Sequence, residues 1–195
     1  MDSLFVSEPS EWVVRYAPHI RPGGLILDVA CGSGRHTRFL AEAGFEVEAV
    51  DRDAGALAGI AVLAGVTVRR ADLENGPWPY RNAAFDGIVV TNYLHRPLFA
   101  RLFNALKMGG VLIYETFSEG NELLGRPRNP DHLLKSGELL EWAEGRLEVN
   151  AYEELCVIKN NISSAANMCH QSCWIIFLSG SLYFRETTDI VNVAA

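Results

Sequence analysis

Short apolar runs alternate with helical patterns along most of this chain. The runs are rich in Val, Ile and Leu, as is typical of strands buried inside a sheet. They are Leu25–Val29, Phe45–Val50, Val66–Arg70, Ala84–Val90 and Val111–Thr116. Strands that alternate with helices along a chain favour an α/β fold with a parallel sheet.

The segments between these runs have apolar residues at helical spacing. After Gly34, for example, Phe39, Leu40 and Ala43 share one helix face, and Gly44 ends the pattern. Further helices are expected at Ser10–His19, Ala54–Leu63, Leu98–Leu106 and from Ser136 through Trp142, and a sixth strand at Leu147–Tyr152.

The composition changes after about residue 155. Acidic residues become rarer, and Ser, Asn and Cys become more frequent. We therefore divide the chain into a domain over residues 1–155 and an atypical C-terminal segment over residues 156–195. Within that segment, Cys173–Leu178 either supplies a seventh strand or belongs to a tail that is foreign to the fold.

Composition and charge narrow the class of protein. The chain has 195 residues, 49% of them hydrophobic, and a net charge of −7. The acidic balance argues against a nucleic-acid surface and favours a small-molecule enzyme, as a monomer or homodimer. No signal sequence and no membrane-spanning run is visible, and four cysteines do not make a disulfide framework, so we expect reduced thiols and a cytoplasmic location.

The strongest candidate for chemistry is the stretch from Leu25 to Asp53. A strand leads into Gly32 and Gly34, a helix follows, and the second strand ends in Asp51. A glycine turn admits a ligand close to the backbone, and the helix start presents unpaired N–H groups. An acid at the end of the second strand can accept hydrogen bonds from both ribose hydroxyls. The stretch therefore predicts a site for an adenosine-containing cofactor.

Two details distinguish between possible cofactors. Thr37 stands where a dinucleotide fingerprint has its third glycine, and Asp28 lies inside the first strand. The pattern Asp-x-x-x-Gly-x-Gly, with an acid about twenty residues later, resembles the S-adenosylmethionine site of class I methyltransferases. One departure is Ala30, where the family often has glycine. In that family, the acid at the position of Asp28 helps to hold the methionine end of the cofactor, often through water.

Other segments resemble the same family. The run Lys107-Met108-Gly109-Gly110, read as a tight turn between a helix and a strand, is similar to it, and the segment around Ser136–Glu154 resembles its tellurite-resistance branch. The resemblance ends near residue 155. It implies a Rossmann-like, doubly wound, mostly parallel sheet of about seven strands in a three-layer α/β/α sandwich.

The resemblance also implies a set of cofactor-binding residues. In the family, an acid after the third strand binds the adenine amino group, and Asp72 matches that position; the alternative is a turn-forming aspartate ahead of Glu74-Asn75-Gly76. The full expected set is Asp28, Ala30, Cys31, Gly32, Gly34, Asp51, Arg52, Ala71, Asp72, Leu73 and Thr91.

Polar residues crowd the end of the fourth strand, in Thr91–Pro97, where the family places the reacting methyl group. We expect Asn92 nearest the methyl, Tyr93 either to orient an acceptor or to cover the cofactor sulfonium with its ring face, and His95 to act as the base. A hydrogen-bonded structural histidine is the alternative for His95. Arg96 is a candidate for an anionic acceptor, or the start of the next helix. Ser118–Asn129 is expected to be a mobile loop over the site.

The predicted function is methyl transfer from S-adenosylmethionine to a small-molecule acceptor by in-line displacement. Two alternatives stay open: a non-catalytic module that binds the cofactor, and a nicotinamide-dependent oxidoreductase on a similar sheet. No metal site is expected, because the cysteines and histidine in Cys169–Cys173 lack a second ligand pair and the usual spacing.

Overall fold

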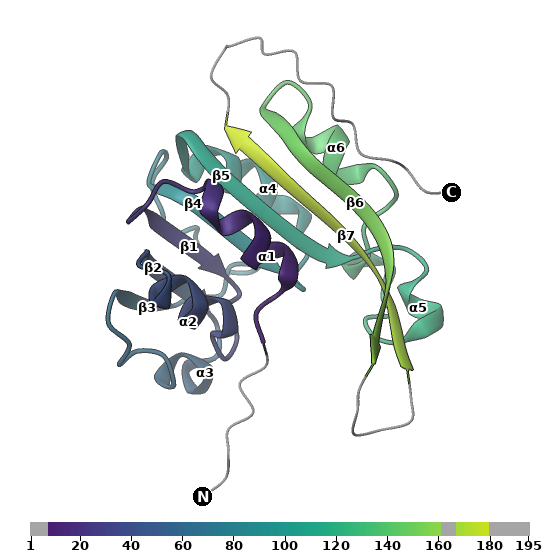
Figure 1. The fold of residues 1–195 in the computed structure, drawn as a ribbon, viewed down its shortest axis with the longest axis horizontal. Coiled ribbons are helices and arrows are strands. Elements are labelled where there is room, and N and C mark those ends of the chain that lie inside the picture. The colour runs from purple at the N-terminus through teal and green to yellow at the C-terminus, as the bar shows by residue number, and fades with distance from the viewer. Residues whose placement is uncertain (1–7, 161–166, 180–195) are drawn as a thin grey trace, which may run out of the picture.

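The structure of this protein is a computed structural model that describes residues 8–160 and 167–179. For residues 155–160 and 167–179 it describes only the course of the backbone. Figure 1 shows one twisted sheet with helices packed on it.

The sheet has the strand order β3-β2-β1-β4-β5-β7-β6. The first five strands along the chain all run parallel to one another. They are β1 (Leu25–Val29), β2 (Glu46–Asp51), β3 (Val66–Arg70), β4 (Phe85–Thr91) and β5 (Leu106–Phe117). The expected parallel α/β sheet of Rossmann-like type is therefore confirmed. The chain order reverses between β1 and β4, where β1 pairs with β2 on one side and β4 on the other, and such a point is where α/β sheets bind ligands.

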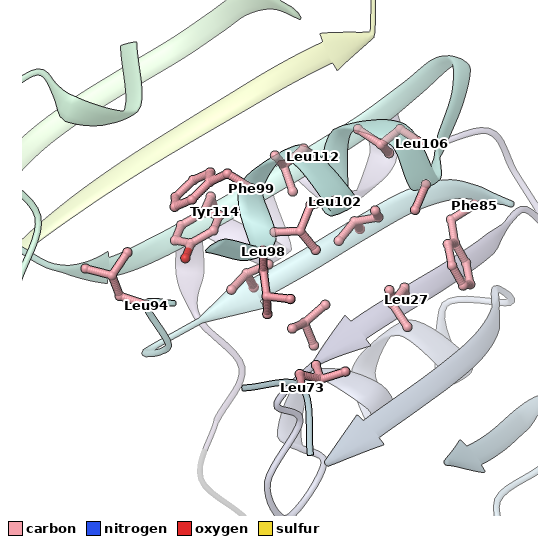
Figure 2. Packing of buried hydrophobic residues seen from close by; sticks show 14 of the residues in the cluster. Leu27, Leu73, Phe85, Leu94, Leu98, Phe99, Leu102, Leu106, Leu112 and Tyr114 are labelled. Atoms are coloured by element: carbon pink, nitrogen blue, oxygen red, sulfur yellow. The ribbon is translucent and has the colours of Figure 1, made fainter. Parts of the chain in front are cut away.

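Helices cover both faces of the sheet. One face carries α1 (Glu11–Tyr16) and α2 (Arg35–Glu42), whose Trp12, Val13 and Leu40 pack against Val89 and Ile113 of the sheet. The opposite face carries α4 (Phe99–Ala105) and α6 (Glu138–Ala143). Figure 2 shows Phe99 and Leu102 of α4 packed with Leu112 and Tyr114 of β5 on this side. The three-layer arrangement follows from these two apolar clusters.

Shorter elements complete the described part of the chain. They are the 3-10 turns Ala17–His19, Arg96–Leu98 and Pro130–His132, and the helices α3 (Ala54–Ala58) and α5 (Asn121–Leu124). The N-terminal helix begins where the sequence predicts, because the Ser10 side chain accepts a hydrogen bond from the Trp12 N–H and caps α1.

Several expected boundaries are wrong. The helix expected at Ala54–Leu63 ends at Ala58, since its alanines supply little apolar surface and only Leu57 of α3 is buried. The expected tight turn at Lys107–Gly110 lies within β5. There the pairing shifts from Phe85 with Leu106 to Gly87 with Val111, so the segment is an irregularity inside a strand.

The C-terminal part of the sheet is antiparallel. Strand β7 (Asn167–Ser179) lies between β5 and β6 (Leu147–Asn160) and pairs with both. Cys173–Leu178 lies within β7, beside Val111–Thr116 of β5. The division of the chain at residue 155 stays a prediction, and residues 161–166 and 180–195 lie outside the described residues.

Candidate cofactor and active site

The glycine turn after β1 has a left-handed backbone at three positions. Ala30, Gly32 and Gly34 have φ values of 52°, 55° and 78°. A Cβ on Gly34 would lie 2.5 Å from Cγ2 of Ile60, so packing requires glycine there. A Cβ on Gly32 would meet nothing within 4 Å, so Gly32 borders open space. Gly34 is therefore needed for packing against Ile60, whereas Gly32 leaves room for a ligand.

Asp51, at the end of β2, accepts hydrogen bonds both from the glycine turn and from the backbone just after its own strand. One carboxylate oxygen accepts the Gly32 N–H at 2.9 Å, and the other accepts the Asp53 N–H at 2.8 Å. Each oxygen can accept a further hydrogen bond. Asp51 therefore both fixes the glycine turn and offers a carboxylate to the space beside it.

Asp72 lies in the turn after β3. Its Oδ1 accepts the N–H groups of Glu74 and Asn75, each at 3.0 Å, and its Oδ2 accepts the Asn75 side-chain amide. The amide and backbone donors of Asn75 lower the pKa of Asp72. The turn-forming alternative for Asp72 is therefore observed, and its place beside the cavity leaves an adenine contact as a prediction.

A cavity of about 390 Å³ opens at the carboxyl ends of β1, β2 and β3. Seven of the expected cofactor-binding residues line it, Ala30, Gly32, Asp51, Arg52, Ala71, Asp72 and Leu73, and so does Tyr93 of the expected catalytic residues. Four others expected at the cofactor do not line it: Asp28, Cys31, Gly34 and Thr91. The sequence did not single out Asp53, Ala56 and Glu74, which complete the lining. Their only signal is that they neighbour Asp51 or Asp72 in the chain.

Asp28 is buried in β1 beneath the glycine turn, with a relative exposure of 1%. Its Oδ2 accepts a 2.6 Å hydrogen bond from the Thr37 hydroxyl, and its Oδ1 has no partner among the described residues. Burial raises the pKa of Asp28 to about 6, against the lowering effect of Thr37. Thr37 stands where a dinucleotide fingerprint has its third glycine. Its hydroxyl thus supplies the hydrogen-bond donor for this carboxyl group.

Cys31 follows in the turn and is buried. Burial and the nearby Asp28 carboxylate raise the pKa of its thiol far above the ordinary value. A thiol that stays protonated is a poor nucleophile, so Cys31 contributes shape and not reactivity.

The expected catalytic residues lie just beyond β4. Tyr93 lines the cavity, and burial raises the pKa of its phenol, so the hydroxyl stays neutral. Asn92 is exposed in a left-handed conformation with φ 54°, and its N–H donates to the Glu115 carbonyl at 2.9 Å. His95 is half-buried and precedes a 3-10 turn, but it does not line the cavity. The structure brings Tyr93 to the cavity and leaves the roles of Asn92 and His95 as predictions.

Arg96 does not stand free for an anionic acceptor. Its guanidinium binds both oxygens of Glu138 at 2.6 and 2.8 Å, and it also donates to the carbonyls of Asp131 and Leu133. The hypothesis that Arg96 binds an anionic acceptor is therefore wrong. Its donors are used to hold α6 and the loop before it against the segment that follows β4.

The segment expected as a mobile loop has structure of its own. Ser118 forms an isolated β-bridge with Leu134, and α5 spans Asn121–Leu124. Asn121 is fully buried, and its side-chain amide donates to the Pro127 carbonyl at 3.0 Å. The loop is thus anchored at both ends beside the carboxyl end of β5.

S-adenosylmethionine fits the residues of this site. Its ammonium group would satisfy the unpartnered Oδ1 of buried Asp28, and its ribose would reach Asp51 next to the open space at Gly32. In contrast, the described side chains include no group of three or more His, Cys, Asp or Glu residues that could hold a metal ion. The Cys169–Cys173 run has no described side chains.

Within the described residues, no helix is long and apolar enough to cross a membrane.

Comparison with known proteins supports this interpretation of the site. Residues 26–110 match a family model described as a methyltransferase domain. A protein of Chlorobaculum tepidum named protein-L-isoaspartate O-methyltransferase is 40% identical over 100 residues, which cover 47% of this chain and 44% of that protein. The chain thus spans less than half the length of this curated relative.

Solved structures agree at the level of the fold. TehB from Haemophilus influenzae superposes with a TM-score of 0.72 at 18% identity, over 88% of this chain and 63% of that one. A TehB-like S-adenosylmethionine-dependent methyltransferase from Corynebacterium glutamicum superposes with a TM-score of 0.60 at 18% identity, over 92% of this chain and 90% of that one. An S-adenosylmethionine-dependent methyltransferase from Mesorhizobium loti superposes with a TM-score of 0.67 at 21% identity, over 89% of this chain and 99% of that one. Residues 26–110 of this chain are therefore similar to a methyltransferase domain, and the described chain has the fold of these methyltransferase structures.

Proposed function

We propose that this protein transfers a methyl group from S-adenosylmethionine to a small-molecule acceptor by in-line displacement. The structural observation that carries the proposal is the buried carboxyl group of Asp28, whose Oδ1 has no partner among the described residues. A buried acceptor without a donor is costly, and a cationic ammonium is the partner that would relieve this cost.

The residues around the cavity divide the work of holding the cofactor. Asp51 would accept the ribose hydroxyls, and Asp72, with Ala71 and Leu73 beside it, would bind the adenine. When bound, the cofactor supplies a methyl group on a sulfonium, which a correctly placed acceptor displaces. The main contribution of the protein is then to hold the acceptor close and in line.

The end of β4 is the natural place for the acceptor. Tyr93 lines the cavity there with a neutral hydroxyl, which can donate to or accept from an acceptor, and its ring can face the sulfonium. His95 would take the proton of an acceptor that must lose one, and Asn92 would lie nearest the methyl group. The hydrogen bond from the Tyr114 hydroxyl to the Tyr93 carbonyl, at 2.8 Å, fixes the backbone of this segment.

A protein acceptor is the second candidate. The Chlorobaculum relative carries the name protein-L-isoaspartate O-methyltransferase, and the match covers 47% of this chain. Against it, the described part of the chain adds no separate recognition domain to the methyltransferase fold. An isoaspartyl peptide therefore belongs in any acceptor screen beside small carboxylates, thiols and amines.

The test begins with titration calorimetry of S-adenosylhomocysteine, with NADH as the comparison. Micromolar binding of S-adenosylhomocysteine alone supports the proposal and argues against the nicotinamide alternative. Release of S-adenosylhomocysteine with one of the acceptors then separates an enzyme from a non-catalytic binding module. Binding of NADH alone, or of neither compound by folded protein, would overturn the proposal.

Three further expectations belong to the proposal. We place the protein in the cytoplasm and expect a monomer or a homodimer with no nucleic-acid partner. The net charge of −7 supports the last of these.

A further inference from the structure

His36 lies in α2, just after the glycine turn, and is 2% exposed. Its Nε2 receives a 3.1 Å hydrogen bond from the backbone N–H of Ser10, the residue that caps α1. A backbone N–H can only donate, so Nε2 carries no proton.

The other ring nitrogen therefore carries the proton. A neutral imidazole has one N–H, and here it must be on Nδ1, which lies 3.1 Å from the Thr91 hydroxyl oxygen. The imidazole stays neutral at ordinary pH, because burial lowers the pKa of His36 to about 3. In this tautomer, Nδ1–H donates and the Thr91 oxygen accepts. The hydroxyl proton of Thr91 is then directed to some other acceptor, and the described residues provide none.

Thr91 is the last residue of β4, and its position relative to the cavity indicates which group would accept its hydroxyl proton. Apart from Tyr93, which follows β4, the cavity is lined by residues at or just after the ends of β1, β2 and β3, which suit a nucleoside. Strand β4 lies on the other side of β1. The amino-acid end of the cofactor would extend from the cavity toward β4, past Asp28. Asp28 offers an acceptor there and Thr91 a donor, a pair that matches an ammonium and a carboxylate.

We propose that His36 is a positioning residue, which holds the Thr91 hydroxyl as a donor to the carboxylate of the cofactor's amino-acid end. The proposal rests on the proposed function, since it assumes S-adenosylmethionine as the ligand. It assigns His36 a role beyond packing at the start of α2. It also explains why a buried histidine joins α1 to the tip of β4 with both ring nitrogens engaged.

The test uses variants that separate the two nitrogens. His36→Asn places an amide near the Nδ1 position and can still donate to Thr91, whereas His36→Gln places its amide near Nε2 and keeps only the Ser10 contact. Thr91→Val removes the hydroxyl at nearly constant volume, and Thr91→Ser keeps it. The ligands are S-adenosylhomocysteine and methylthioadenosine, which lacks the amino-acid end.

We expect His36→Gln and Thr91→Val each to weaken S-adenosylhomocysteine binding about tenfold, the effect of one hydrogen bond to a charged group. His36→Asn and Thr91→Ser should stay within about threefold, and the double variant His36→Gln/Thr91→Val should bind about as weakly as Thr91→Val alone. Methylthioadenosine affinity should not change in any of them. A packing role alone would weaken both ligands and would not make the two substitutions non-additive.

Other outcomes would overturn the inference without touching the proposed function. Equal losses for both ligands, or unchanged S-adenosylhomocysteine affinity in Thr91→Val, would do so while the unaltered protein still binds S-adenosylhomocysteine. A failure of the unaltered protein to bind either ligand would instead remove the proposed function. Should the His36 variants not fold, ¹⁵N NMR of the unaltered protein decides the tautomer: a protonated Nε2 would contradict the hydrogen bonds on which the inference is built.

Discussion

Two aspartates in this protein accept backbone hydrogen bonds and also line the candidate ligand cavity. Asp51 accepts the N–H groups of Gly32 and Asp53, and Asp72 accepts those of Glu74 and Asn75, while both line the cavity. The sequence pattern predicts the ligand role from the positions of these acids. It cannot separate that role from turn formation, because aspartate suits both for the same reason, a short side chain with two acceptor oxygens.

Asp51→Ala should weaken S-adenosylhomocysteine binding by about 1–3 kcal/mol, because the ribose hydroxyls lose a charged acceptor and the Gly32 N–H loses its partner. Calorimetry measures the effect. Glu46→Ala, exposed at the start of the same strand, is the control and should leave affinity unchanged. Equal affinities for Asp51→Ala and the unaltered protein would remove the ribose role.

Asp28 should make the stability of the ligand-free protein depend on pH. Its pKa rises from 3.8 to about 6 on folding, so the folded state holds the proton more tightly than the unfolded state. The resulting stabilisation is full below about pH 4 and is lost as the pH rises through about 6. It amounts to about 3 kcal/mol, at about 1.4 kcal/mol for each pH unit between the two values.

Asp28→Asn tests this effect, because the amide stays neutral at every pH. Urea unfolding between pH 4 and 7 should show the free energy of unfolding of the unaltered protein falling relative to that of the variant. Parallel curves for the two proteins would mean that Asp28 ionises in the folded state as readily as in the unfolded one.

Ala30 is a residue with a left-handed backbone and a Cβ. Its φ of 52° costs about 1–2 kcal/mol for a residue other than glycine. Ala30→Gly should raise the free energy of unfolding by about 0.5–1 kcal/mol, since part of the relief is offset by the freer unfolded chain. Ala41→Gly, inside α2, should lower it by about 1 kcal/mol. A loss of stability in Ala30→Gly would show that the turn carries no strain.

At the scale of elements, the central strands were the most predictable and the short helices the least. Strands β1 to β4 begin and end within one residue of their apolar runs. For β1 and β4 the reason is burial, because buried parallel strands are apolar on both faces. Helix α3 stops at Ala58, and α5 appears inside a segment predicted to be a loop. Short helices depend on what they pack against, and the local sequence carries little of that information.

The contact between Arg96 and Glu138 shows how elements distant in the chain fix each other. Arg96 precedes α4 and Glu138 begins α6, and Glu138 is only 8% exposed. Arg96→Met should lower the free energy of unfolding by about 2–3 kcal/mol, because it leaves Glu138 nearly buried without its bidentate partner. Thermal or urea unfolding measures the change.

Arg101→Met is the matched control, since Arg101 is exposed on α4, and it should change stability by at most about 0.5 kcal/mol. Adding Glu138→Gln to Arg96→Met should cost little more, because the charge left unpaired is then gone. Additive losses would mean that the two side chains stabilise the fold independently of each other.

At the scale of the whole molecule, β7 covers the edge of β5 that faces away from β4. Residues Val111–Thr116 of β5 are buried, and the β5 backbone pairs with β7 from Val111 to Phe117. Figure 1 shows β7 between β5 and β6. The composition of the C-terminal segment left two alternatives open, and strand pairing over residues 167–179 joins this stretch to the sheet.

Removal of residues 155–195 should therefore expose the edge of β5 and cause association. Size-exclusion chromatography should show aggregates, and thermal unfolding should lose its cooperative transition. Removal of residues 180–195 alone keeps both strands and should leave the unfolding temperature close to that of the full chain. A monodisperse shorter chain with an unchanged transition would mean that β5 does not depend on β7.

The sequence by itself determined the α/β class, the apolar runs that form the parallel strands, and the acids and glycines around the candidate cofactor cavity. These follow from local chemistry: a buried strand must be apolar, and a left-handed turn favours glycine. Tertiary structure alone decided that Gly34 is required by Ile60, that Thr37 serves Asp28, that Arg96 is used by Glu138, and that His36 joins Ser10 to Thr91. Each of these contacts joins residues that the fold brings together from separate segments, and hydrophobic periodicity carries no information about such pairs.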